Sequence, residues 1–283
     1  MLGSLAKSLQ AVRQKPKTKE PKLIAVTSPH GSTGKTIVAI NIALELAAEK
    51  YRVLIIDADL AGSSVANYFC LSELPVGLAG ALRIASQKRF DETQLERLSV
   101  QVPRTSITVL PGIMGELTVE PTMDSLLEII KVAKQAFDFV VVDSGSVPSK
   151  NLEFNLAKGF IQQADLVMLV ASADPVGIYR LLGIEASILE LTPEPKLVIN
   201  RLRNSVIPQA KSEIKTTLSK LGSIEVAAFF PEDSAQVDQA TRDGMVGVRL
   251  GRAGSFKSAA SIFTKGVILG RQGVLDARVA KLG

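Results

Sequence analysis

The chain has 283 residues, 46% of them hydrophobic and 22% charged, with a formal net charge of +5. Its single cysteine (Cys70) excludes a disulfide framework and any zinc site built from several cysteines, and its single histidine (His30) argues against histidine-based metal or triad chemistry. No apolar run approaches the roughly 18 residues of a membrane-spanning helix, and residues 1–20 lack a signal-peptide core, so we expect a cytoplasmic protein with one large α/β domain.

The N-terminal segment, residues 1–21, is basic: five Lys or Arg against one Glu give a charge of +4. Leu2, Leu5 and Leu9 recur at helical spacing, which predicts a short amphipathic helix followed by a polar linker. So short a helix would fold only on a partner, a membrane surface or its own domain. Residues 1–15 are therefore the candidate segment for a peripheral membrane contact, and a merely solvated basic tail is the alternative.

The body of the chain alternates short β-branched apolar runs with longer amphipathic patterns. Near-continuous apolar strands separated by amphipathic helices are typical of a parallel sheet covered on both faces. We therefore expect an α/β domain over residues 22–250, with a mostly parallel sheet and helices on both faces. Residues 251–283 form a basic C-terminal segment that either packs on this domain or trails from it. The predicted strands are 22–28, 52–57, 106–110, 139–143, 166–171, 196–200 and 224–230.

A glycine-containing loop, PHGSTGKT at residues 29–36, follows the first predicted strand and precedes a helical pattern. In that position, backbone N–H groups of the loop and of the helix N-terminus would hold phosphate oxygens. Lys35 would reach the β- and γ-phosphates, and the Thr36 hydroxyl would ligate Mg²⁺. The strict pattern G-x-x-x-x-G-K-[ST] fails at its first position, where Pro29 stands. The residues expected to hold the phosphates are Gly31, Ser32, Thr33, Gly34, Lys35 and Thr36.

Carboxylates follow two other predicted strands. Asp57 and Asp59 come at the end of the second strand, and Asp143 ends the FVVVD strand. The carboxyl ends of parallel strands meet at the ligand-binding edge of an open α/β sheet, so these side chains should lie beside the loop. Either carboxylate at the end of the second strand would orient a water or hold the metal's water shell, and Asp143 suits an outer-shell Mg²⁺ contact. Together with the loop, these carboxylates predict a P-loop NTPase-like fold.

These motifs resemble those of the MinD/ParA superfamily of deviant Walker A P-loop ATPases, over about residues 22–247. The family's loop K-G-G-x-G-K-[TS] falls on residues 30–36, and the aspartate that the family uses for hydrolysis falls on Asp59. The resemblance implies that Lys35 and Asp59 are the catalytic residues, that ATP and Mg²⁺ are the cofactors, and that the chain forms a homodimer on ATP binding. The implied metal contacts are Thr36, Asp59 and Asp143.

Two further positions match the superfamily's adenine site. The adenine-reading Asn, at the end of a late strand, falls on Asn200, and the following I-P-x-D turn falls on residues 230–233, with Pro231 beside the base. The family's A-x-x-x-G helix end is met by residues 240–244. The resemblance therefore implies recognition of adenine rather than guanine.

Residues 77–112 are similar to the CpaE/TadZ branch of this superfamily, whose members localise and help assemble tight-adherence type pili, often at a cell pole. The shared features are a GLxxxL helix, a D-x-x-x-L-x-x-L helix and a T-V-L-P-G strand. The resemblance implies partners from a pilus or secretion machine, or polar-localisation proteins. Many members carry a receiver-like domain in front; with residues 1–21 alone before the first strand, we do not expect docking through such a domain.

Two departures from the superfamily bear on hydrolysis. Its signature lysine, which crosses to the partner subunit's phosphates, is replaced by His30, a shorter and weaker base. Loss of a transition-state cation of this kind costs roughly 10³–10⁵ in rate. We therefore expect nucleotide binding with slow hydrolysis; the alternative is that His30 merely fills space in the loop. The switch after the Walker B strand reads DSGS at residues 143–146 and lacks the family's Pro pair, so its coupling to the γ-phosphate is open.

Two other functions remain open. A ParA-like DNA partitioner would bind nucleoid DNA through surface cations, although the chain has no Trp and only 5% aromatic residues for base contacts. A catalytically silent scaffold would bind nucleotide, or nothing, and simply hold partners; the presence of Lys35, Thr36 and Asp59 argues against complete loss of binding. The cations of the DNA hypothesis are Arg201, Arg203, Lys211, Arg242, Arg249, Arg252 and Lys257.

Overall fold

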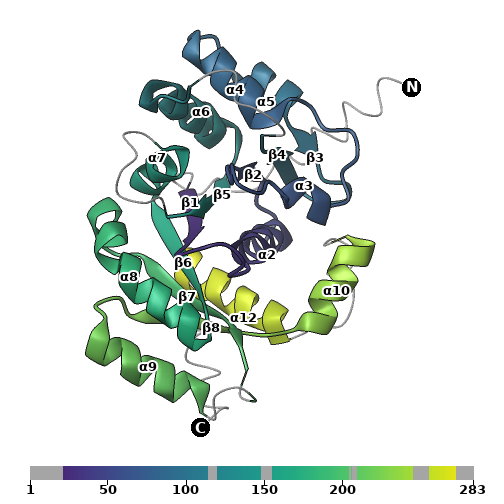
Figure 1. Ribbon diagram of the computed structural model, residues 1–283. Coiled ribbons are helices and arrows are strands. Elements are labelled where there is room, and N and C mark those ends of the chain that lie inside the picture. The colour runs from purple at the N-terminus through teal and green to yellow at the C-terminus, as the bar shows by residue number, and fades with distance from the viewer. Residues whose placement is uncertain are drawn as a thin grey trace.

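The computed structural model describes residues 22–113, 120–147, 155–203, 205, 209–244 and 255–271 (Figure 1). The strands are β1 (Lys22–Ser28), β2 (Val53–Asp57), β3 (Val100–Gln101), β4 (Ile107–Leu110), β5 (Phe139–Ser146), β6 (Leu166–Ser172), β7 (Lys196–Leu202) and β8 (Val226–Pro231). The helices are α2 (Lys35–Ala48), α3 (Val65–Tyr68), α4 (Gly77–Ser86), α5 (Glu92–Leu98), α6 (Met123–Ala136), α7 (Leu156–Gln163), α8 (Pro175–Leu191), α9 (Ala210–Leu221), α10 (Ser234–Asp243) and α12 (Ser255–Phe263), followed by the π-helical turn η1 (Thr264–Ile268).

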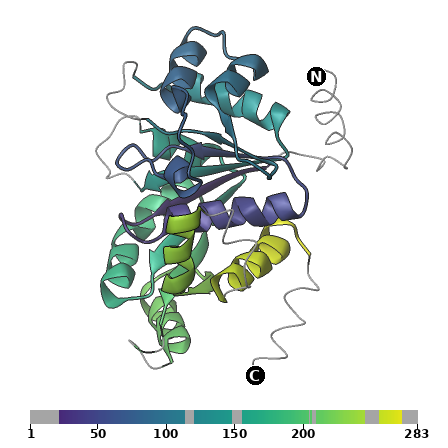
Figure 2. The same cartoon turned by 90° about the vertical axis from the view of Figure 1, so that its right-hand side faces the viewer.

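In the described chain the strands form one sheet in the order β3-β4-β2-β5-β1-β6-β7-β8. Every neighbouring pair is parallel except β3 and β4, which pair antiparallel at one edge. Helices lie on both faces of the sheet, as Figures 1 and 2 show. The predicted fold class, a mostly parallel α/β sheet with helices on both faces, is therefore confirmed.

All seven predicted strands are present, and six of them begin and end within two residues of the predicted bounds; the two larger differences are in β5 and β3. β5 continues past Asp143 to Ser146, because polar groups fasten this stretch to β1: Ser144 Oγ donates to Val26 O at 3.0 Å, and Thr27 Oγ1 donates to Gly145 O at 2.9 Å. The second difference is β3, which is only two residues long. Two residues offer no alternation of apolar and polar side chains, so the sequence pattern did not reveal this strand.

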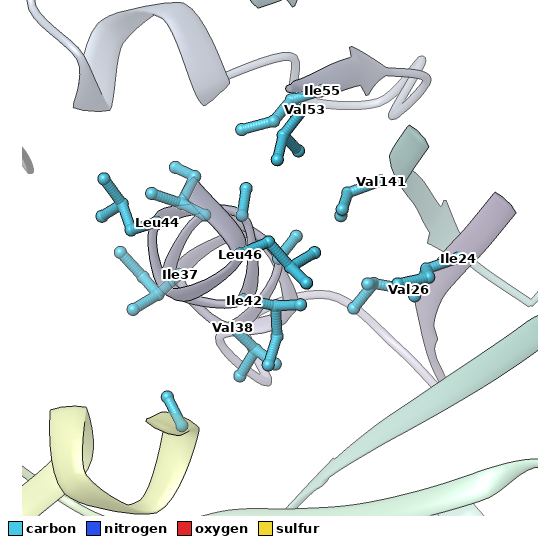
Figure 3. Packing of buried hydrophobic residues seen from close by; sticks show 14 of the residues in the cluster. Ile24, Val26, Ile37, Val38, Ile42, Leu44, Leu46, Val53, Ile55 and Val141 are labelled. Carbon is cyan, nitrogen blue, oxygen red and sulfur yellow. The ribbon is translucent and has the colours of Figure 1, made fainter. Parts of the chain in front are cut away.

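Successive residues of the central strands pack on opposite faces of the sheet. Ile24 and Val26 of β1, with Val53 and Ile55 of β2, are fully buried in one hydrophobic cluster with α2. Figure 3 shows α2 lying over this face, with Ile42 and Leu46 on its side toward the strands and Ile37 and Leu44 on the other side. Dense packing of this kind holds a helix rigidly. The N-terminus of α2 and the loop before it are thereby fixed at the carboxyl edge of the sheet.

The opposite face is covered by two further groups of helices. Leu23 of β1 belongs to a cluster with β2, β5 and the helices α4, α5, α6 and α7. Ala25 of β1 belongs to a second cluster, in which α8 and α9 cover β6 and β7. The central strands are therefore buried on both sides, which explains why their sequences read as continuous apolar runs.

The C-terminal helix α12 packs beside α2 and against β8, as Figure 2 shows. Phe256 and Phe263 are buried and make edge-to-face contacts with Phe230 of β8, with ring centroids 5.2 Å and 6.1 Å apart. Beyond α12, Lys265 and Arg271 both pair with Glu49 at the end of α2, at 3.3 Å and 2.7 Å. Residues 255–271 thus pack on the core. The division of the chain at residue 250 remains a proposal, and the segment 1–21 lies outside the described residues.

No helix in the described part of the chain combines the length and the apolar character that crossing a bilayer requires.

Candidate functional site

The predicted site residues come together at the carboxyl edge of the sheet. The loop after β1 leads into α2, Asp59 follows β2, Asp143 lies in β5 and Asn200 lies in β7. Asp57 of β2 and Asp143 are directly opposite each other in the parallel register of β2 and β5. This convergence follows from the topology, because adjacent parallel strands deliver their last residues to one edge.

The phosphate loop is shaped by two residues in left-handed conformation, Ser32 (φ 65°) and Gly34 (φ 85°). A Cβ on Gly34 would lie 2.5 Å from Asn200 Nδ2, so only glycine fits there without displacement. Gly34 also caps α2 with no side-chain hydrogen bond to the first-turn N–H groups. Gly31 and Ser32 are exposed and Thr33 is fully buried. The loop therefore presents backbone amides at a helix N-terminus, as an anion site requires.

Two contacts join α2 to the strand-end carboxylates. Lys35 Nζ donates to Asp59 Oδ2 at 2.5 Å, and Thr36 Oγ1 donates to Asp143 Oδ2 at 2.5 Å. All four residues are buried, between 0% and 9% exposed. Burial of a charge is costly unless it is paired, so each of these groups depends on its partner. The predicted catalytic pair and the predicted metal residues are thus in direct contact.

Burial shifts the ionisation of two of the carboxylates. It raises the pKa of Asp57 to about 7, with the nearby charge of Asp143 adding to the effect. Asp57 is fixed in place by the N–H of Val65, which donates to its Oδ2 at 3.0 Å. Burial also raises the pKa of Asp143, although Lys35 and the Thr36 hydroxyl act in the opposite direction. Both shifts show that these strand ends form a desolvated acidic centre, which an added cation would stabilise.

Asn200 connects β7 to the phosphate loop. It is 3% exposed, and its Nδ2 donates to Thr33 O at 2.8 Å. Its Oδ1 is buried without a hydrogen-bond partner among the described residues. Pro231, the other predicted adenine residue, ends β8 and pairs in register with Leu202 of β7. The two residues therefore lie on neighbouring strands, at the same edge as the loop.

His30 folds back on its own loop. Its Nδ1 lies 2.6 Å from Gly31 O, and Ser28 Oγ donates to the His30 carbonyl at 2.7 Å. Nε2 is buried and has no partner in the described ranges. Burial by itself raises the pKa of Asp174. Hydrogen bonds from Ser172 and from backbone amides, together with the charge of His30, outweigh this effect, so the pKa of Asp174 is lowered overall. His30 thus folds onto its own loop, and its charge acts on the carboxylate of Asp174, the N-cap of α8.

The buried polar atoms that have no hydrogen-bond partner at this edge are suited to bind Mg²⁺ and a nucleoside triphosphate. Asp143 Oδ1, Thr33 Oγ1 and Asn200 Oδ1 are buried and unpartnered within the described chain. Oxygen atoms are the ligands that Mg²⁺ prefers, and it is usually held by one or two protein groups, waters and substrate phosphates. The described residues contain no cluster of three or more His, Cys, Asp or Glu side chains placed to hold a metal ion. Thr36, Asp59 and Asp143 could hold the ion.

Two glycines not predicted as site residues set how closely the acidic centre packs. A Cβ on Gly145 would lie 3.1 Å from Asp59 Oδ1, and Gly145 itself has φ 76°. A Cβ on Gly112 would lie 2.0 Å from Ser63 Oγ and 3.0 Å from Asp57 Cγ. Both glycines stand in sequence motifs, LPG and DSGS, but only the folded geometry shows what a side chain there would meet.

Known proteins resemble this chain in sequence and in fold. The family described as CobQ/CobB/MinD/ParA nucleotide binding domain matches residues 24–245. A putative septum site-determining protein MinD from Emiliania huxleyi is 25% identical over 231 residues, covering 79% of this chain and 78% of the relative. The structure of a ParA family ATPase from Chlorobium tepidum has a TM-score of 0.72 at 17% identity, covering 87% of this chain and 99% of that one. The structure of MinD from Pyrococcus horikoshii complexed with Mg-ADP has a TM-score of 0.67 at 19% identity, covering 90% and 98%.

The matched region begins in β1 and ends two residues beyond α10. It therefore includes the phosphate loop, Asn200 and the strand-end carboxylates Asp57, Asp59 and Asp143. The similar structures share the fold, and one of them holds Mg-ADP. The chain belongs to the CobQ/CobB/MinD/ParA nucleotide-binding family, as a member of the MinD/ParA superfamily of P-loop ATPases.

Proposed function

We propose that this protein is a Mg-ATP-dependent dimerisation switch that hydrolyses ATP slowly. The observation that carries the proposal is the pair of buried contacts Lys35–Asp59 and Thr36–Asp143 beside an uncapped helix N-terminus. These contacts put a cation, a hydroxyl and two carboxylates where a triphosphate on the loop would end. The relative with bound Mg-ADP supports ATP and Mg²⁺ as the cofactors.

The Lys35–Asp59 pair suggests how binding prepares hydrolysis. When phosphate oxygens enter the loop, Lys35 can exchange its contact with Asp59 for the β- and γ-phosphates. Asp59 is then free to accept a hydrogen bond from a water and to orient it toward the γ-phosphate. Held by Thr36, Asp143 and Asp59, Mg²⁺ would neutralise the phosphate charge. Asn200, through its unpartnered Oδ1, would accept a hydrogen bond from the amine of adenine, beside Pro231.

Slow hydrolysis is proposed because of the residue that replaces the superfamily's signature lysine. His30 has its Nδ1 2.6 Å from the carbonyl of its own neighbour, Gly31. A side chain held in this way does not reach across to another subunit. The charge that the signature lysine supplies to a partner's phosphates is therefore missing from this loop.

Molar mass by light scattering tests the switch directly. We expect the mass of the native chain to double with Mg-ATP, and that of Lys35→Ala to stay at the monomer value, because Lys35 is needed for nucleotide binding. For ATP to drive dimerisation, it needs only to bind the dimer more tightly than the monomer. A mass that does not depend on ATP in the native chain would contradict the proposal.

The cellular role that we propose is that of the CpaE/TadZ branch: localising or assembling a tight-adherence or type IV-like pilus, or a secretion machine. The support is the order of elements α4, α5 and β4 over residues 77–112, which agrees with the motifs of that branch. We place the protein in the cytoplasm, at a pole or at the membrane surface. Membrane contact through residues 1–15 falls outside the described residues. Co-purification with pilus-assembly proteins from cells, lost on Lys35→Ala, is the result that this role requires.

DNA partitioning remains the second candidate, and no observation in the described chain favours it. Of the cations proposed for DNA binding, Arg203 is paired with Glu232 at 2.9 Å. Arg249 and Arg252 lie outside the described residues. Retention of the protein on DNA that falls steeply with salt would favour this candidate over the pilus role.

A further inference from the structure

β7 carries one extra residue where it reaches the nucleotide site. Its pairing with β8 shifts register between Ile199 and Leu202: these are three positions apart, whereas their partners, Phe229 and Pro231, are two apart. A bulge of this kind re-aims a side chain, and bulges are common beside binding sites. The exposed residue within the bulge is Arg201.

Arg201 is held in a conformation that a side-chain-bearing residue avoids. Its φ is 58°, in the left-handed region. The preceding residue, Asn200, is buried and anchored, because its carbonyl accepts the N–H of Ala173 at 2.8 Å and its side chain bonds to Thr33. Backbone strain of this kind persists where the surrounding fold imposes it, and it gathers at ligand sites.

The Arg201 side chain lies beside the phosphate loop. Its Nε is 3.9 Å from the point that a Cβ on Gly34 would occupy. Arg201 forms no ion pair with the residues described, whereas Arg203 on the same strand end is paired with Glu232. An arginine held at the nucleotide loop, without a carboxylate partner in the described chain, is available to a ligand.

We propose that Arg201 binds the nucleotide by stacking its guanidinium on one face of the purine ring; this inference rests on the proposed nucleotide binding. Lys35 and the loop amides provide for the phosphates, and Arg201 lies beside Asn200, whose unpartnered Oδ1 can accept a hydrogen bond from the adenine amine. A base held there is within reach of a planar guanidinium. Arginine stacks on aromatic rings by cation–π attraction, and lysine lacks the planar surface.

The test compares a ligand that has a base with one that lacks it. Binding of Mg-ADP and of Mg-tripolyphosphate is measured by calorimetry for the native chain, Arg201→Ala, Arg201→Lys and the matched control Arg203→Ala. We expect Arg201→Ala to weaken ADP binding about five- to thirty-fold, between the values for an exposed and a desolvated cation–π contact. Arg201→Lys should recover part of this loss. Tripolyphosphate binding should be unchanged in all variants, and Arg203→Ala should bind both ligands as the native chain does.

Equal losses for ADP and tripolyphosphate in Arg201→Ala would overturn the inference, because Arg201 would then contact phosphate. Unchanged ADP binding in Arg201→Ala would overturn it as well, while leaving the proposed function intact. Failure of the native chain to bind ADP at all would instead overturn the proposed function, and this inference with it. Equal thermal unfolding midpoints of the four proteins without ligand show that the substitutions act on binding and not on the fold.

Discussion

Individual residues of the phosphate loop differ sharply in what they tolerate. Gly34 has φ 85°, and a Cβ there would lie 2.5 Å from Asn200 Nδ2. Gly31, three residues earlier, has no atom within 4 Å of the corresponding point. The two glycines of one motif therefore serve different purposes: Gly34 lets the loop close against Asn200, and Gly31 leaves room at the exposed side of the loop.

Gly34→Ala should destabilise the fold and abolish nucleotide binding. The left-handed backbone costs a residue with a Cβ about 1–2 kcal/mol, and displacement of Asn200 adds to that cost. Gly31→Ala is the matched control and should change stability by less than about 0.5 kcal/mol. Urea unfolding and ADP titration of both variants check this. Similar effects of the two substitutions would show that the Gly34–Asn200 approach does not matter.

His30→Lys should speed ATP hydrolysis. A lysine restores the long, fully charged side chain of the family's loop, and cations at this position of a transition state are worth several orders of magnitude in rate. We expect at least about a tenfold rise in kcat with little change in ADP affinity, measured by phosphate release. His30→Ala should not produce the rise. A native chain that already hydrolyses ATP as fast as His30→Lys would refute the role given to this position.

Among individual residues, the sequence indicated which ones form the ion pairs and hydrogen bonds of the site, but not how those residues are surrounded. Lys35, Asp59 and Asp143 could be predicted because their spacing from strand ends follows from the topology. The raised pKa of Asp57 could not, because it depends on burial and on its distance from Asp143. The position of Arg201 was equally hidden, since no local pattern predicts a bulge or a left-handed arginine.

Among the elements, long apolar strands were predictable and short or irregular pieces were not. β1, β5 and β7 are buried on both faces, so their sequences read as continuous apolar runs. The π-helical turn η1 was not predicted; it includes Gly266, and glycine weakens a regular helix. Tertiary packing of α12 on β8 and the pairing of Lys265 with Glu49 hold this region in place. C-terminal residues are thus tied to the helix that carries the phosphate loop.

Phe263→Ala should destabilise the protein by about 3–5 kcal/mol, the usual cost of removing a buried phenylalanine. Phe263 is 2% exposed and packs edge-to-face on Phe230. The control is Leu221→Ala, at a side chain that is 67% exposed, which should cost less than about 0.5 kcal/mol. Urea denaturation of both variants measures the difference. Equal stabilities would mean that α12 does not belong to the cooperative core.

At the scale of the whole molecule, the two edges formed by the carboxyl and amino ends of the parallel strands carry different groups. The carboxyl edge holds the buried acidic centre, the loop and the N-terminus of α8, where Val176 and Tyr179 are 57% and 77% exposed. Leu221, at the C-terminal end of α9, is also exposed but lies toward the amino edge, since helices of this fold run antiparallel to the strands. A dimer that closes over ATP must form at the carboxyl edge, because the nucleotide loop lies there.

Tyr179 should therefore contribute to the ATP-dependent dimer, whereas Leu221 should not. Tyrosine is enriched among residues that dominate protein interfaces, and removing such a residue costs about 2 kcal/mol or more. We expect Tyr179→Ser to weaken Mg-ATP-dependent dimerisation at least about thirty-fold, measured by sedimentation over a concentration series. ADP affinity of the monomer should be unchanged, because Tyr179 is exposed and takes part in none of the site contacts described above. The control Leu221→Ser removes another exposed side chain, and this variant should dimerise as the native chain does. If Leu221→Ser weakens the dimer while Tyr179→Ser does not, the subunits meet elsewhere and the switch does not close over its nucleotide.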